Sequence, residues 1–183
     1  MKMTYDDQVV QITFNTFSRE EYLEIKLLLE IISKQSQKKS TKENWPDSLH
    51  SETKGYFDTC TIYDEDLRSI IIDRCIDLYG TISDETLYNI IYHESQGESS
   101  INWHEDGDDL YSGAVTFYFN DAWNLDFGGY FIYQKDNDKV MTSIQPVGNT
   151  SLYVQRGVLH AVTPIRYDAP SRKSIQVFIR HNE

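Results

Sequence analysis

The sequence predicts a single α+β domain in which two amphipathic helices pack on one sheet of a sandwich or jelly-roll barrel of short strands. Three observations favour this fold class. The chain has 183 residues, of which 39% are hydrophobic, and this suits one sizeable core rather than two. Helical hydrophobic spacing is confined to a helical front, residues 1–84. In residues 85–183, short runs rich in Tyr, Ile, Val, Phe and Thr alternate with clusters of turn residues, the pattern of a jelly-roll core.

The chain is expected to begin with a strand and a helix. Residues 9–15 alternate well enough for a β-strand. Ser18 is followed three residues later by Glu21, the spacing of a capping box at a helix N-terminus. An apolar stripe then continues to about Ser33, so we predict an amphipathic helix over this segment.

A loop and a second helix complete the front part. Residues 35–56 are polar and contain Pro and Gly, so they are predicted to form a long loop. Residues 65–79 carry apolar side chains at helical spacing, with Asp64 as a suitable N-cap and Gly80 as a suitable stop. Cys75 falls on the apolar side of this helix, which predicts a buried thiol.

The second half is expected to be built from strands. Each candidate strand is a short run of β-branched and aromatic residues bounded by Gly, Asn, Asp or Pro. Helices packed outside one sheet of such a barrel give an α+β domain. The candidate strands lie near residues 86–93, 101–105, 113–119, 128–134, 140–145, 151–155, 159–164 and 173–180.

Charge and composition restrict the partners. The formal net charge is −12, which disfavours nucleic acid and anionic membranes as partners. No apolar run approaches the ~20 residues that cross a bilayer, and no apolar signal segment follows the N-terminus. Two cysteines are too few for a disulfide framework. We therefore expect a cytoplasmic protein that binds neither nucleic acid nor a membrane.

Three side chains in the second half could bind a metal ion. His104 and Asp106 are two residues apart, and on an extended chain such positions point to the same face. His160 could join them from a later strand. Two imidazoles and one carboxylate form the facial triad of non-haem iron(II) oxygenases. Spacing alone leaves another interpretation open, because histidines at a surface or with partners inside the fold produce the same pattern.

An arginine near the C-terminus suggests a site for an anion. Alternation along the last predicted strand places Arg172, Ser174, Gln176 and Phe178 on one face. If that face lines the barrel, the buried guanidinium needs an anion, and its fork suits a carboxylate. A dicarboxylic co-substrate would supply one. The alternative is a surface arginine with a solvated head.

A tyrosine on another predicted strand could assist. Thr116, Tyr118 and Asn120 share one face of their strand. Tyr118 could therefore point inward and donate its hydroxyl to the same carboxylate. A core tyrosine with a backbone partner is the alternative.

Taken together, the stretch from His104 to Phe178 resembles the catalytic core of the prolyl-hydroxylase-like branch of the iron(II)/2-oxoglutarate dioxygenases. The resemblance covers about 75 residues and rests on elements that follow in the family's order, which makes it more specific than any single motif. These elements are His104-x-Asp106, Tyr118-Phe119-Asn120-Asp121-Ala122-Trp123, Gly128-Gly129, Ile144-Gln145-Pro146, Gly157-Val158-Leu159-His160-Ala161-Val162-Thr163-Pro164 and Arg172-Lys173-Ser174.

The resemblance implies a double-stranded β-helix (jelly-roll) core and a role for each matching residue. The family's Tyr-x-x-Gly element is only loosely reproduced, because the glycine is Gly97. The implied iron(II) ligands are His104, Asp106 and His160; the implied contacts to 2-oxoglutarate are Arg172, Tyr118, Ser174 and, less closely matched, Tyr92; the implied lining of the substrate pocket is Phe178 and Trp123.

The implied activity is that of a 2-oxoglutarate-dependent dioxygenase, which uses dioxygen and iron(II) and releases succinate and CO2. Ascorbate is an optional reductant. Hydroxylation of a C–H bond is the default reaction, and the lack of an accessory domain favours a small-molecule or amino-acid- or peptide-derived substrate. A peptidyl or protein prolyl hydroxylase is one alternative. A non-catalytic jelly-roll binding module is an alternative of another class.

Acidic residues beside the proposed metal ligands offer a hypothesis about the substrate. Glu105, Asp106, Asp108 and Asp109 cluster beside His104. Such a rim would attract a cationic, amine-bearing substrate. A solvated acidic loop explains the same residues.

Overall fold

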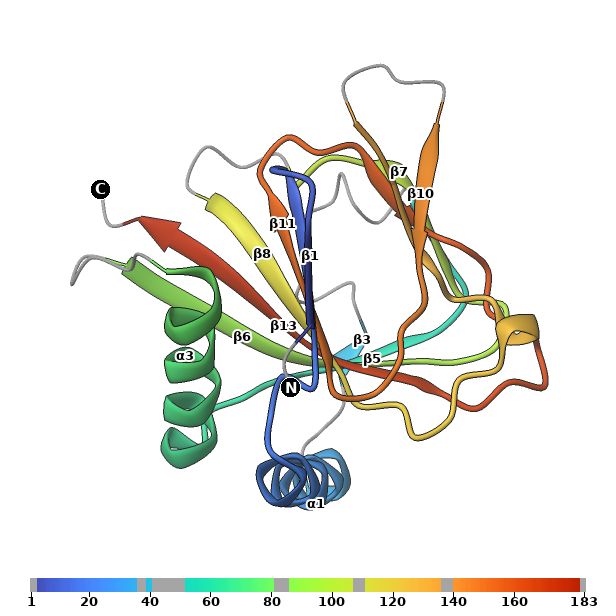
Figure 1. Cartoon of the computed structure of the whole chain (residues 1–183). Coiled ribbons are helices and arrows are strands. Elements are labelled where there is room, and N and C mark those ends of the chain that lie inside the picture. The colour runs from blue at the N-terminus through green and yellow to red at the C-terminus, as the bar shows by residue number, and fades with distance from the viewer. Residues whose placement is uncertain are drawn as a thin grey trace.

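The computed structural model describes residues 3–35, 39–40, 52–80, 86–106, 111–135 and 140–181. These residues form two mainly antiparallel sheets and two helices, which is consistent with a jelly roll (Figure 1). In spatial order, the large sheet contains β1 (Met3–Asp6), β2 (Val10–Phe14), β11 (Thr150–Gln155), β8 (Tyr111–Tyr118), β13 (Arg172–His181), β6 (Thr86–Ser95), β5 (Phe57–Thr61) and β3 (Lys39–Ser40). The small sheet contains β10 (Met141–Ile144), β9 (Phe131–Gln134), β12 (His160–Val162), β7 (Ser100–His104) and β4 (Thr53–Lys54).

The two helices cover the outer face of the large sheet. They are α1 (Arg19–Gln35) and α3 (Glu65–Tyr79). The buried residues between helices and sheet come from α1, α3, β5, β6, β8 and β13. A second buried cluster joins β2, β8 and β11 of the large sheet to β9 and β10 of the small sheet. The inner face of the large sheet therefore packs on the small sheet at one side, next to the pocket described below.

Alternation along β13 separates the helix-covered face from the inner face. Ile175 and Val177 are fully buried in the cluster beneath the helices. Arg172, Ser174 and Gln176, on the opposite face, line a pocket between the two sheets. The expected division of this strand is thus confirmed.

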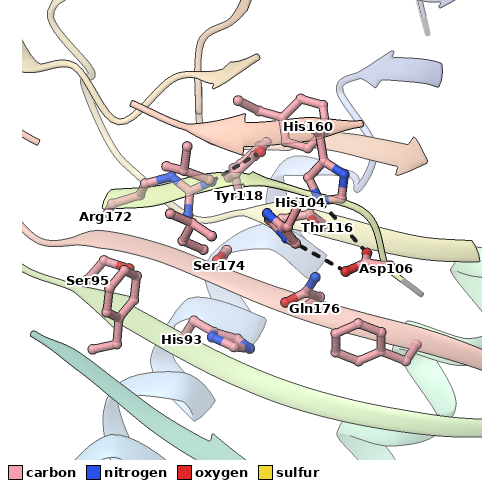
Figure 2. A pocket seen from close by; sticks show the side chains of 15 residues that line it. His93, Ser95, His104, Asp106, Thr116, Tyr118, His160, Arg172, Ser174 and Gln176 are labelled. Carbon is pink, nitrogen blue, oxygen red and sulfur yellow. Dashed lines mark hydrogen bonds and ion pairs between the residues drawn. The ribbon is translucent and has the colours of Figure 1, made fainter. Parts of the chain in front are cut away.

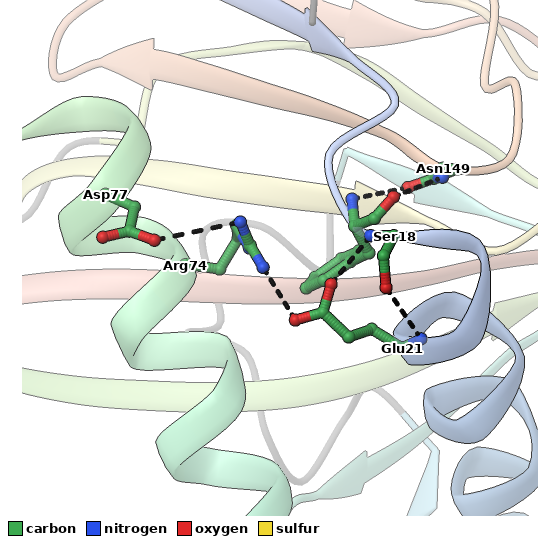
Figure 3. Close-up of polar contacts among 6 residues, drawn as sticks. Ser18, Glu21, Arg74, Asp77 and Asn149 are labelled. Atoms are coloured by element: carbon green, nitrogen blue, oxygen red, sulfur yellow. Dashed lines mark hydrogen bonds and ion pairs between the residues drawn. The ribbon is translucent and has the colours of Figure 1, made fainter. Parts of the chain in front are cut away.

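Polar contacts fix how α1 begins and how it meets α3 (Figure 3). Glu21 N donates to Ser18 Oγ at 3.2 Å, and Ser18 N donates to the Glu21 carboxylate at 2.7 Å. This is the predicted capping box. Arg74 of α3 donates to the other oxygen of Glu21 at 2.9 Å. The side chain of Asn149 bonds both the N–H and the carbonyl of Phe17, at 2.8 and 3.0 Å.

The predicted elements of regular structure are largely confirmed. Asp64 caps α3 by accepting from Leu67 N at 2.9 Å, and Gly80 ends it. Cys75 is buried, as expected. Each of the eight strands predicted after residue 85 has a counterpart, and β2 matches the strand predicted before α1. Neither helix in the described part of the chain is long and apolar enough to cross a membrane.

The front part, residues 1–84, contains more strands than the one predicted at residues 9–15. Residues 3–6 and 57–61 form β1 and β5, and the predicted loop over 35–56 contributes β3 and β4, with residues 36–38 and 41–51 outside the described residues. The two-residue strands are too short to show alternation. β5 is buried on both faces, including Asp58 and Thr59, so its sequence lacks the alternation that reveals a half-exposed strand.

Candidate metal centre

Strand pairing in the small sheet brings three potential metal ligands together. His104 is the last residue of β7, Asp106 follows two residues later, and His160 is the first residue of β12. His160 is the register partner of His104 across the two antiparallel strands. One ligand atom of each residue lies within 4.8 Å of the other two. Figure 2 shows the three side chains meeting at one end of a pocket.

Backbone carbonyls orient both imidazole rings. Nδ1 of His104 lies 2.8 Å from Asn102 O, and Nδ1 of His160 lies 2.8 Å from Val158 O. A carbonyl can only accept, so each Nδ1 carries the proton and each Nε2 keeps a free lone pair. The two Nε2 atoms lie 3.8 and 3.9 Å from the Asp106 carboxylate oxygens. These distances are too long for hydrogen bonds, and the three groups can therefore turn their lone pairs to one shared ion.

Burial favours the metal-binding form of His160. Its side chain is buried, and burial lowers the pKa of the imidazole, assisted by the adjacent His104 and opposed by Asp106. A buried imidazole in low dielectric is kept neutral. The neutral ring is the form that binds a metal ion.

The other end of the pocket contains a buried arginine. Arg172 is 7% exposed. Its Nε donates to Gly129 O at 3.1 Å, and its Nη2 donates to the Tyr118 hydroxyl at 3.3 Å. No carboxylate among the described residues forms an ion pair with Arg172. Burying a charge without an opposite charge is costly, so this geometry is suited to an anionic ligand with one carboxylate beside the guanidinium.

Tyr118 and Ser174 flank this arginine. Tyr118 is fully buried and lies directly opposite Ser174 on the neighbouring strand. Its hydroxyl accepts from Arg172 and therefore retains its own proton for donation. Burial raises the pKa of Tyr118 despite the nearby guanidinium, so the hydroxyl stays protonated. The sequence-predicted Arg172, Tyr118 and Ser174 are thus brought together.

A turn of two glycines supports the arginine. Gly128 and Gly129 both have positive φ values, +70° and +66°. A Cβ on Gly128 would lie 2.1 Å from the carbonyl oxygen of Pro164. Glycine is therefore required here, and the turn aims Gly129 O at Arg172 Nε. Trp123 also stabilises this turn, since its Nε1 donates to Gly128 O at 2.8 Å.

Two polar pocket residues of β6 were not identified from the sequence. His93 and Ser95 of β6 line the pocket beside Ser174 and Arg172, their register partners on β13. Burial, assisted by the positive charge of Arg172, lowers the pKa of His93 to about 3. Two polar residues at alternate positions of an apolar strand are the signal that could have revealed them.

Tyr92 does not reach the pocket. It belongs to the apolar cluster beneath the helices, because the alternation that points His93 inward turns its neighbour outward. Burial raises the pKa of its hydroxyl, and its side chain is part of the core. Phe178 lines the pocket as expected, whereas Trp123 lies outside the lining and packs edge-on against Phe127.

Comparisons with known proteins show which solved structures share this architecture. No protein-family model matches the sequence, and no curated protein matches it. Solved structures do match. A prolyl-4-hydroxylase from Pseudomonas putida superposes with a TM-score of 0.71 at 14% identity, over 96% of this chain and 94% of that chain. A member of the 2OG-Fe(II) oxygenase family from Burkholderia pseudomallei gives 0.69 at 17%, over 96% and 86%.

A third match carries ligands. HygX from Streptomyces hygroscopicus, solved with nickel and 2-oxoglutarate bound, superposes with a TM-score of 0.65 at 10% identity, over 96% of this chain and 84% of that chain. The chain has the fold of the 2-oxoglutarate oxygenases. On this oxygenase fold, the described residues place a His-Asp-His group at one end of the pocket and a buried arginine at the other.

Proposed function

We propose that this protein is an iron(II)- and 2-oxoglutarate-dependent dioxygenase that hydroxylates a C–H bond of a small-molecule or amino-acid- or peptide-derived substrate. The observation that carries the proposal is a single pocket lined at one end by His104, Asp106 and His160 and at the other by Arg172. The two ends match the two functional parts of a 2-oxo dicarboxylic acid, its metal-chelating 2-oxo acid and its distal carboxylate. The two sheets would then form the double-stranded β-helix core of this enzyme class.

The donor set fits iron(II). Two Nε2 atoms and one carboxylate form a facial triad that leaves positions open for other ligands. His104, Asp106 and His160 would hold the ion, and the carbonyls of Asn102 and Val158 would orient the two imidazoles. The bound iron would supply the activation of dioxygen, coupled to oxidative decarboxylation of 2-oxoglutarate to succinate and CO2 with one oxygen atom entering the substrate.

The opposite end fits the distal carboxylate of 2-oxoglutarate. Arg172 would neutralise it, and the hydroxyls of Tyr118 and Ser174 would donate to it. Two protein groups, Gly129 O and the Tyr118 hydroxyl, accept hydrogen bonds from the fork of Arg172 and hold it in place. This preorganisation lowers the entropy lost on binding. Ascorbate, as an optional reductant, would need no site in the pocket.

Two other functions compete with this proposal. A peptidyl or protein prolyl hydroxylase uses the same triad, and the superposition on a Pseudomonas putida prolyl-4-hydroxylase favours it. A non-catalytic jelly-roll binding module would be favoured by the loss of a ligand or of the arginine, and the chain retains both. Dioxygen and an organic substrate are the partners of either enzyme, and neither nucleic acid nor a membrane is proposed as a partner.

Equilibrium binding tests the proposal without knowledge of the substrate. Calorimetry with Mn(II), a redox-stable substitute for iron(II), is expected to show one site, and 2-oxoglutarate is expected to bind only after the metal. Succinate, which lacks the 2-oxo group, should bind at least tenfold more weakly. A protein that binds neither Mn(II) nor 2-oxoglutarate would contradict the oxygenase proposal and support the binding module.

A further inference from the structure

The charges lining the pocket are few. Among the described lining residues, only Asp106 and Arg172 carry a formal charge at neutral pH. Under the proposed function, the first binds the metal ion and the second binds the co-substrate. His93 adds no charge, since burial and the nearby Arg172 lower the pKa of its imidazole to about 3. Among the described residues, the space left for a substrate therefore has no counter-ion for a cationic or an anionic group.

One polar side chain in that space has no use in the proposed mechanism. Gln176 of β13 lines the pocket between Ser174 and Phe178. Figure 2 shows its amide pointing into the pocket, toward the end that contains His104 and Asp106. No other described residue forms a hydrogen bond with this amide. It thus presents a free N–H donor and a free carbonyl acceptor to a ligand.

Thr116 extends this polar surface. It is the register partner of Gln176 on β8 and lines the same pocket. Within the described part of the chain, its hydroxyl is also free of hydrogen bonds. Side chains that are directly opposite across two strands lie about 5 Å apart at Cβ, so the amide and the hydroxyl can contact one ligand group together.

The walls around this pair are apolar. Ile101, Phe131 and Val162 of the small sheet and Phe178 of the large sheet line the pocket. A polar ligand group that enters between such walls loses water, and this costs free energy unless its donors and acceptors are paired. A carboxamide matches Gln176 donor to acceptor and acceptor to donor, without bringing a charge into the pocket.

We propose that Gln176 and Thr116 form a substrate subsite that selects an uncharged, carboxamide-bearing group and holds it beside the metal centre. The inference rests on the proposed function and adds a substrate class to it. This subsite differs from the acidic rim, which would attract a cationic group. Glu105 is exposed and does not line the pocket, and Asp108 and Asp109 lie outside the described residues.

Four probes that share a phenyl ring test this subsite without oxygen chemistry: benzamide, benzoate, benzylammonium and acetophenone. Their binding to the protein loaded with Zn(II) and saturating 2-oxoglutarate is measured by saturation-transfer NMR. Benzamide is expected to bind at least tenfold more tightly than either charged probe. Acetophenone, which keeps the acceptor and lacks the donor, is expected to bind more weakly than benzamide.

Variants assign the selectivity to the named residue. Gln176→Leu is expected to weaken benzamide about tenfold and to remove its advantage over acetophenone. Gln176→Glu is expected to shift the preference to benzylammonium, because it places a carboxylate where the amide was. Gln155→Leu, the same change at an exposed position of β11, is the matched control and should leave all four affinities unchanged.

The outcomes separate this inference from the proposed function. A charged probe that binds as tightly as benzamide, a benzamide preference that survives Gln176→Leu, or no benzamide binding by protein that still binds Zn(II) and 2-oxoglutarate would each overturn the subsite. Failure to bind Zn(II) and 2-oxoglutarate would instead overturn the oxygenase proposal on which it rests.

Discussion

His160 is the register partner of His104, and the centroids of their two imidazole rings lie 4.2 Å apart. The residues are far apart in the chain and meet because β7 and β12 are antiparallel neighbours in the small sheet. In this pairing, Nε2 of each ring lies near the carboxylate of Asp106. The candidate metal site therefore depends on the strand register, and a change in that register would separate its ligands.

Metal binding is expected to require each member of this group. Asp106→Asn should weaken Mn(II) binding at least a hundredfold, because the amide removes the negative ligand from the triad. In the wild type, Mn(II) at 100 times its Kd should raise the free energy of unfolding by about 2.7 kcal/mol. Urea denaturation with and without metal measures this gain. Asp126→Asn, at an exposed residue, is the control, and an equal loss in both variants would argue against the site.

The affinity for 2-oxoglutarate is expected to depend on Arg172. Arg172→Met keeps much of the side-chain length but removes the charge, and should weaken 2-oxoglutarate at least a hundredfold while leaving Mn(II) binding within threefold. Tyr118→Phe should cost about 1 kcal/mol, roughly fivefold, as expected for one neutral hydrogen bond. Arg166→Met, at an exposed arginine paired with Asp168, is the control. Unchanged 2-oxoglutarate affinity in Arg172→Met would contradict the assignment.

The free energy of unfolding is expected to decrease as the pH is lowered, because His93 is buried in the folded protein. Its pKa is lowered to about 3 in the folded protein by burial and by Arg172, whereas the unfolded value is about 6.5. Below pH 6.5 the unfolded chain binds a proton that the folded protein does not bind, so acid favours unfolding. From pH 7.5 to 5.5 this residue should cost about 1.4 kcal/mol.

Urea denaturation of metal-free protein at these two pH values checks the effect. In His93→Asn, which cannot titrate, the loss of stability between pH 7.5 and 5.5 should be smaller than in the wild type by about 1.4 kcal/mol. Identical losses in the two proteins would show that His93 titrates normally and is exposed to water.

The start of α1 is expected to contribute to stability independently of the pocket. Ser18→Ala removes the side-chain acceptor for Glu21 N, which should lower the free energy of unfolding by about 1 kcal/mol. Ser143→Ala, at an exposed position of β10, should change it by less than about 0.5 kcal/mol. The Mn(II) and 2-oxoglutarate affinities should be unchanged in both variants, and a weakened site in Ser18→Ala would link the cap to the pocket.

Much of this arrangement could be predicted from local patterns. Alternation on β13 was informative because Arg172, Ser174 and Gln176 interrupt an apolar strand on one face only. The spacing of His104 and Asp106 placed both on one side of an extended chain. These inferences need only the periodicity of a single strand.

Other features depend on relations between strands. β6 is buried on both faces, and the alternation of His93 and Ser95 indicates a polar face without showing that this face lines the pocket. Pairing of Ser174 with His93 decides this, and register is a long-range property that one strand does not encode. β3 and β4 are two residues long and owe their strand geometry to their neighbours.

Succinate formation from 2-oxoglutarate reports on the iron site, the co-substrate site and the proposed activity in one assay. Purified protein would be loaded with iron(II) without oxygen, given 2-oxoglutarate, and exposed to air, beside His104→Ala and Arg172→Ala. We expect succinate from the wild type, at least a hundredfold less from His104→Ala, and a rate from Arg172→Ala that recovers only at much higher 2-oxoglutarate. Equal succinate formation by the wild type and His104→Ala, or none from a wild type that binds neither ligand, would contradict the oxygenase proposal.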